Sequence, residues 1–164
     1  MADHDIYLGN PNLKKANTPI EFTQEQILEF MACKHDPVYF AKEHVKIVTL
    51  DAGLMPFEPY DFQEGLIKNF HENRFNICKM PRQTGKSTTV ISYLLHYLLF
   101  NDSVNIGILA NKAATARELL GRLQTAYENV PKWMQQGVLS WNRGSLELEN
   151  GSKILAASTS ASAV

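Results

Sequence analysis

The chain has 164 residues, of which 45% are hydrophobic and 20% charged, so it is long enough for one globular domain and too apolar for wholesale disorder. Its net charge of −1 predicts no gross affinity for nucleic acid, and its two cysteines form no disulfide framework. The longest apolar stretch, residues 90–100, is too short to cross a bilayer. No basic segment followed by an apolar one begins the chain, so no secretory signal is predicted.

The charge is unevenly spread along the chain. Residues 1–73 hold six lysines against twelve acids, whereas residues 74–164 hold ten lysines and arginines against five acids. The second part therefore has the charge needed to face phosphates. Chance together with solvated helix faces is the alternative explanation.

The N-terminal third is predicted to be an arm followed by short helices. Residues 1–22 contain turn formers without a period and are expected to lack regular structure. A capping box then begins a helix at Thr23, which is expected to bury Ile27, Phe30 and Met31.

Further start signals follow this first helix. Asp36 precedes a proline and is the predicted N-cap of a second short helix. Residues 45–48 indicate a short strand, and residues 53–59 an irregular connection. Asp61 and Glu64 form a second predicted capping box, which begins a helix that runs toward residue 70.

The remainder of the chain alternates strands and helices. A strand is predicted over residues 75–79, followed by a nearly all-apolar and buried helix over 86–100. A strand that is covered on both faces is predicted over 104–110, followed by a helix over 113–127. A hairpin is predicted over 145–157, with its turn at Asn150 and Gly151. This alternation predicts an α/β domain with a parallel core.

The segment with the clearest chemistry is residues 80–87, MPRQTGKS, between a predicted strand and a predicted helix. That context is typical of a phosphate-binding loop, because the backbone N–H groups at a helix N-terminus attract anions. Gly85 lets the backbone approach the phosphates, Lys86 reaches the β and γ oxygens, and the Ser87 hydroxyl binds Mg²⁺. Met80 replaces the first glycine of the usual pattern. A loop with a merely solvated lysine is the alternative.

Residues 81–87 resemble the deviant Walker A loop of the large terminase subunits of tailed bacteriophages, most closely those of contractile-tailed, T-even-like phages. Residues 60–63, YDFQ, resemble the adenine-recognising glutamine motif of that family. Residues 107–112 and 141–152 resemble its next strand and loop and the hairpin ahead of its acidic motif. The resemblance covers residues 55–164.

The resemblance implies a P-loop NTPase-type parallel sheet flanked by helices, incomplete in this chain, with a small and mostly helical N-terminal region. The expected organisation is an arm over residues 1–22, a helical subregion over 23–54, and the N-terminal part of an ATPase domain over 55–164.

The resemblance also implies roles for single residues. Lys86 and Arg82 are the expected catalytic residues, Arg82 as a finger within the same chain that stabilises charge near the γ-phosphate. Gln63 is the expected adenine reader, and Ser87 the Mg²⁺ ligand. The expected ATP-binding residues are Gln63, Arg82, Gln83, Thr84, Gly85, Lys86, Ser87 and Thr88. A solvent-facing arginine and a helix-surface glutamine are the alternatives for Arg82 and Gln63.

The implied function is that of a motor that couples ATP hydrolysis to the movement of double-stranded DNA into a viral procapsid. The expected partners are DNA contacted without regard to sequence, the portal protein, the small terminase subunit and further copies in a ring. The expected location is the host cytoplasm, at the portal vertex, without a membrane. A helicase-like ATPase and a non-enzymatic nucleotide-binding fragment are the alternatives.

The chain also departs from the family pattern, because no charged residue follows Lys153. An ATPase of this kind needs an acidic strand that binds Mg²⁺ and activates water. We therefore expect an N-terminal piece of a large terminase without these carboxylates and without the nuclease half. A natural, flexible Ser/Ala-rich tail over residues 154–164 is the alternative.

Overall fold

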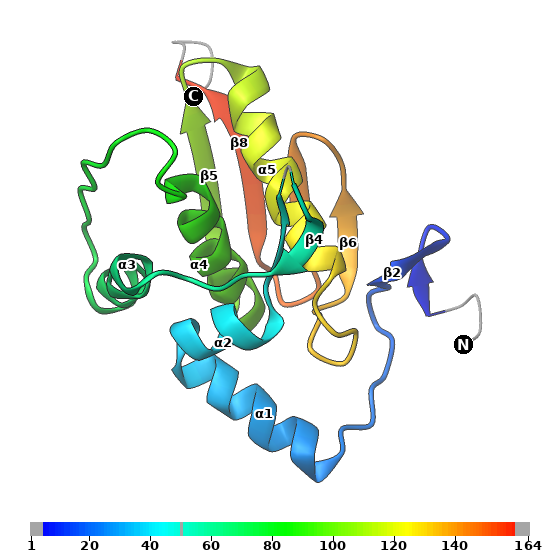
Figure 1. Cartoon of the computed structure of the whole chain (residues 1–164). Helices are drawn as coiled ribbons and strands as arrows, with labels where there is room; N and C mark the ends of the chain where they lie inside the picture. Colours follow the sequence, from blue (N-terminus) through cyan, green and yellow to red (C-terminus); the bar gives the residue numbers. More distant parts are fainter. Residues whose placement is uncertain (1–4, 50, 160–164) are drawn as a thin grey trace.

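The structure is a computed structural model that describes residues 5–49 and 51–159. Its helices and strands form a mixed α/β fold (Figure 1). The elements in chain order are β1 (Ile6–Tyr7), β2 (Asn10–Lys14), α1 (Gln24–His35), α2 (Pro37–His44), β3 (Lys46–Thr49), β4 (Gly53–Pro56), α3 (Asp61–Glu72), α4 (Lys86–Phe100), β5 (Asn105–Ala110), α5 (Ala113–Glu128), β6 (Val138–Trp141), β7 (Ser145–Leu148) and β8 (Lys153–Ser158).

The largest sheet has four strands in the order β5-β8-β7-β6. β5 and β8 run parallel, with Ile106 opposite Ile154, whereas β7 pairs antiparallel with both β8 and β6. The predicted parallel core is therefore limited to one strand pair among the described residues. The hairpin of β7 and β8, which turns at Asn150 and Gly151, is confirmed.

The prediction that helices cover both faces of β5 is wrong for the described part of the chain. α5 packs against β5 and β8, and the buried side chains of Ile108 and Ile154 face this core. Leu109 and Leu155, on the alternate positions, are 63% and 57% exposed. The period-2 alternation of a strand places these leucines on the opposite face, which no described helix fills.

The predicted strand over residues 75–79 is also wrong. This segment has no strand pairing in the structure, and Phe75 and Ile77 are 82% and 100% exposed. A strand is stable only beside a hydrogen-bonding neighbour, and β5 pairs with β8 alone. Its apolar residues resemble those of a strand, but the segment does not pair with the free edge of β5 or with any other described strand.

The predicted N-terminal arm forms a β-hairpin instead of an irregular segment. β1 and β2 join through Leu8 and Gly9, both with positive φ, as a two-residue hairpin turn requires. Leu13 is 1% exposed, and Lys15 forms a parallel bridge to Val138, which places the hairpin beside β6 (Figure 1). These contacts between distant segments have no local signal in the sequence.

Helix α1 begins as predicted but buries a different side. The capping box of Thr23 and Gln26 is present. Ile27 and Met31 are 51% and 45% exposed, contrary to prediction, and Cys33 is the residue that α1 buries fully. The partly buried Phe30 packs against the core.

The helices that follow are close to the predictions. The Asp36 carboxylate caps α2, as predicted, and α4 has the predicted bounds. α3 begins one residue earlier than its predicted capping box, because Tyr60 is the N-cap. The predicted irregular connection contains β4, which pairs with β3. Residues 154–158 of the proposed tail belong to β8, and residues 160–164 lie outside the described residues.

Glu149 joins the N-terminal hairpin to the sheet. Its carboxylate accepts hydrogen bonds from the Lys14 ammonium at 2.9 Å and from the backbone N–H groups of Asn17 and Gly137 at 2.8 and 2.6 Å. Burial raises the pKa of Glu149, but these three donors outweigh burial and leave its pKa below the ordinary value. The ionised carboxylate therefore stabilises the fold.

We expect Glu149→Gln to lower the free energy of unfolding at pH 7 by about 1–3 kcal/mol, because charge-assisted hydrogen bonds are lost. The folded-state pKa is depressed, so this stabilisation is present at neutral pH and is lost as the pH falls below about 5. Urea unfolding at several pH values should show the difference between parent and variant shrinking in acid.

Glu147→Gln is the matched control for this prediction. The ion pair of Glu147 with Lys153 is exposed, and such pairs contribute about 0–1 kcal/mol. Equal losses in the two variants, or a loss in Glu149→Gln that does not change with pH, would contradict the assigned role of Glu149.

Candidate functional site

The loop of residues 80–85 leads directly into α4. Gly85 is the N-cap and has a φ of 72°, a left-handed conformation that glycine adopts without strain. The first hydrogen bond of the helix runs from the Thr89 N–H to the Gly85 carbonyl at 2.9 Å. The N–H groups of residues 86–88 therefore precede the hydrogen-bond ladder of the helix, and such groups are available to an anion.

Lys86 holds the loop in a compact form. Its ammonium donates to the Met80 carbonyl at 2.9 Å and to the Pro81 carbonyl. The Thr84 hydroxyl also donates to the Pro81 carbonyl, at 3.0 Å. The loop thus curves around the ammonium group of the first residue of α4.

Gln63 comes from α3 and lies against this loop. The side chain is 3% exposed, so Gln63 is not a helix-surface residue. Its Oε1 accepts a hydrogen bond from the Tyr60 N–H at 2.9 Å. Its Nε2 lies 2.4 Å from the position that a Cβ on Gly85 would occupy. The structure therefore brings Gln63 and Gly85 into close contact.

The other predicted site residues lie on the same loop and in the first turn of α4. Arg82, Gln83 and Ser87 are exposed, and Thr88 is half-buried. Gln83 has a φ of 60°, which for a residue other than glycine indicates a tightly constrained turn. The roles of Arg82 as a finger and of Ser87 as a Mg²⁺ ligand stay predictions.

An exposed aromatic pair at the start of α3 was not predicted from the sequence. The rings of Tyr60 and Phe62 are stacked with a centroid distance of 5.8 Å and an interplanar angle of 12°. They are 70% and 49% exposed. Their sequence positions on either side of Asp61, at the start of α3, are the signal that could have identified the pair. Flat apolar faces of this kind suit a planar ring.

Taken together, these residues define a mixed α/β protein with a candidate anion-binding loop at the N-terminus of a buried helix. Backbone amides, one ammonium group and several hydroxyl groups lie at this loop and the first turn of the helix. None of the described helices is long and apolar enough to cross a membrane.

The family of terminase large subunits of the T4-like virus type, in its N-terminal part, matches residues 77–163. The match covers more than half of the chain, and the chain belongs to this family. The matched region contains the loop, α4, α5 and all four strands of the largest sheet, while Gln63 and α1 to α3 precede it. This family takes part in phage DNA packaging, so the match indicates a role in that process.

The contact between Gly85 and Gln63 yields a test of the site geometry. Gly85→Ala should lower the free energy of unfolding by about 1–2 kcal/mol, because the residue has a positive φ. The new Cβ would also displace Gln63. Gly65→Ala, in α3 with open space around it, should instead raise stability by about 0.5–1 kcal/mol. Denaturant unfolding of both variants measures the contrast, and a neutral Gly85→Ala would show that the loop geometry is wrong.

Proposed function

We propose that this chain is the ATP-binding part of a viral DNA-packaging motor, with Mg²⁺-ATP held at the start of α4. The observation that carries the proposal is the convergence of Gln63, Gly85 and Lys86 at one helix N-terminus. The family to which the chain belongs agrees with this function.

The proposed phosphate site consists of the loop amides and the Lys86 ammonium. Backbone N–H groups at residues 86–88 and the positive end of the helix dipole favour a polyphosphate. Phosphate oxygens would replace the carbonyls of Met80 and Pro81 as the acceptors of the Lys86 ammonium. Thr84 and Thr88 would border the phosphates, with the Ser87 hydroxyl as a Mg²⁺ ligand. Mg²⁺ would supply charge neutralisation of the phosphates, and the exposed Arg82 is proposed to stabilise charge near the γ-phosphate.

The proposed adenine site consists of Gln63 and the aromatic pair. A side-chain amide can donate to and accept from an adenine edge. The Oε1 atom of Gln63 has a second lone pair beyond the bond from Tyr60, and Nε2 has two hydrogens. The stacked rings of Tyr60 and Phe62 are exposed at the start of the same helix and would support a base by stacking.

The wider assembly is proposed from the same family relationship. Double-stranded DNA contacted through its backbone, the portal protein, the small terminase subunit and further copies in a ring are the proposed partners, at the portal vertex in the host cytoplasm. The positive residues of the second half of the chain suit a sequence-independent contact with phosphates.

Lys86→Ala should weaken ATP binding, because a charge-assisted contact to the phosphates is lost. A loss of about 1.5–3 kcal/mol corresponds to roughly a 10- to 150-fold rise in Kd. Isothermal titration calorimetry with Mg²⁺-ATP measures it, and Lys68→Ala, an exposed lysine on α3, is the control. Equal ATP affinities of Lys86→Ala and the parent would show that the phosphates do not bind at this loop.

Gln63→Glu should reduce the preference for ATP over GTP. The variant keeps an acceptor for the Tyr60 N–H, so the start of α3 is retained, but it loses the Nε2 donor. An unpaired buried polar group costs about 1–3 kcal/mol, and we expect the preference to fall by that amount. Competition of ATP and GTP for the chain measures this, with the thermal midpoint as a check on folding. An unchanged preference in a folded variant would limit Gln63 to a structural role.

A further inference from the structure

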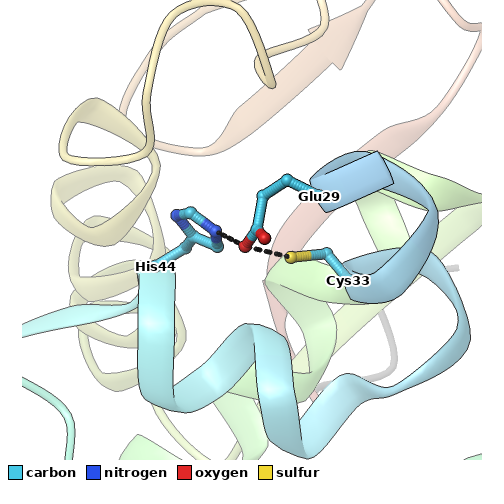
Figure 2. Close-up of side chains that lie close together, drawn as sticks. All are labelled: Glu29, Cys33 and His44. Carbon is cyan, nitrogen blue, oxygen red and sulfur yellow. Dashed lines mark hydrogen bonds and ion pairs between the residues drawn. The ribbon is translucent and has the colours of Figure 1, made fainter. Parts of the chain in front are cut away.

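A second group of reactive side chains lies at the junction of α1 and α2, apart from the loop before α4. Glu29 and Cys33 are four residues apart on α1, so they share one helix face. His44 is the last residue of α2. Figure 2 shows the imidazole and the thiol both directed at the Glu29 carboxylate. The three residues are a carboxylate, a thiol and an imidazole, and each is a metal ligand in proteins.

The local sequence folds the chain so that these groups meet. Asp36 ends α1 and caps α2 by accepting hydrogen bonds from the N–H groups of Val38 and Tyr39 at 2.9 and 3.0 Å. α2 therefore turns back beside α1, and its two turns place His44 opposite Glu29. His44 lies eleven positions after Cys33, which is why the sequence alone did not indicate a ligand spacing.

The ligand atoms are close enough to share one ion. His44 Nε2 lies 2.7 Å from Glu29 Oε1, and Cys33 Sγ lies 3.6 Å from the same oxygen. All three ligand atoms lie within 4.8 Å of one another. In a tetrahedral site with metal bonds of about 2.0–2.3 Å, ligand atoms are about 3.3–3.6 Å apart. The carboxylate-to-imidazole distance would open by about 0.6 Å, and the carboxylate-to-thiol distance already fits.

We propose that Glu29, Cys33 and His44 bind a zinc ion that joins α1 to α2. The mixed set of one sulfur, one nitrogen and one oxygen ligand suits Zn²⁺ and disfavours Mg²⁺ and Ca²⁺, which take oxygen ligands. Three protein ligands leave the fourth position to water. The site is chemically distinct from the proposed Mg²⁺ position at Ser87.

The surroundings of the three groups help to fix the carboxylate. Zinc binding to the Cys33 thiol would release a proton to solvent. The Tyr39 hydroxyl donates to Glu29 Oε2 at 3.0 Å and would orient the carboxylate.

The position of the site indicates a structural role. In α1, Cys33 alone is fully buried, so this helix has few apolar contacts that fix it. A zinc bridge would anchor α1 to α2, which packs against α3 and α4. Trp133 lies beside His44, with ring centroids 6.3 Å apart, and provides a fluorescent probe of the site.

The test uses the whole chain under reducing conditions, titrated with Zn²⁺ or Co²⁺. Co²⁺ replaces zinc and gives visible bands that report tetrahedral geometry, together with a thiolate charge-transfer band in the near ultraviolet. We expect one ion per chain, quenching of Trp133 by Co²⁺, and a rise in the thermal midpoint with Zn²⁺.

Cys33→Ser, His44→Asn and Glu29→Gln should each remove these responses. The matched controls Cys78→Ser, His35→Asn and Glu43→Gln change exposed residues of the same types and should keep them.

Tyr39→Phe should weaken zinc binding by about 10- to 100-fold without abolishing the charge-transfer band, as for other groups that orient a ligand. Circular dichroism checks that each variant is folded, and His44→Asn and Glu29→Gln keep the test valid if Cys33→Ser does not fold. The proposal is overturned if the parent binds no zinc at one ion per chain. It is also overturned if Cys33→Ser keeps the charge-transfer band or Cys78→Ser loses it.

Discussion

The position of the loop before α4 depends on the hydrogen bonds that the last carbonyl groups of α4 accept at the buried end of the helix. The last carbonyls of a helix have no partner within it, and burial makes them costly when unpaired. The Asn150 side chain donates to the carbonyls of Leu98 and Asn101, both at 3.0 Å, and the Ser152 hydroxyl donates to Asn101 at 3.0 Å. The turn between β7 and β8 therefore holds the far end of α4. Because the helix is rigid, this contact also determines where the loop at its other end lies.

The elements that the sequence predicted well are those with strong local signals. The bounds of α4 follow from its long apolar run, and the turn of β7 and β8 from Asn150 and Gly151. The strand prediction for residues 75–79 failed because their composition fits a strand, whereas strand pairing depends on a neighbour that can lie anywhere in the chain. The N-terminal hairpin was missed for the same reason. Buried Gln135 donates to the Asn12 carbonyl and accepts from the Lys14 N–H, contacts that span more than 120 residues.

The residues of the candidate site were predicted from the sequence, but the contacts between them were not. The resemblance to a family put Gln63 and the loop in one site, and the sequence had no means to show that Gln63 would lie against Gly85. The pairing arises because α3 packs on α4 with its N-cap toward the loop, so one amide serves both the start of α3 and the loop. The cluster of Glu29, Cys33 and His44 was missed because it needs the turn at Asp36 to bring two helices together.

The cluster and the loop are linked to opposite ends of α4, which makes them separable. The Cys33 carbonyl hydrogen-bonds with His96 Nε2 at 2.9 Å, and Phe30 packs on Phe100 with ring centroids 4.9 Å apart. These contacts hold the C-terminal half of α4, whereas Lys86 begins the helix ten residues before His96, about 15 Å away along its axis. A change at the cluster would loosen α1 from the rest of the fold, because α1 has few other buried contacts. The loop would keep its geometry as long as Asn150 holds the far end of the helix. Zinc affinity and nucleotide affinity are therefore independent readouts of the two sites.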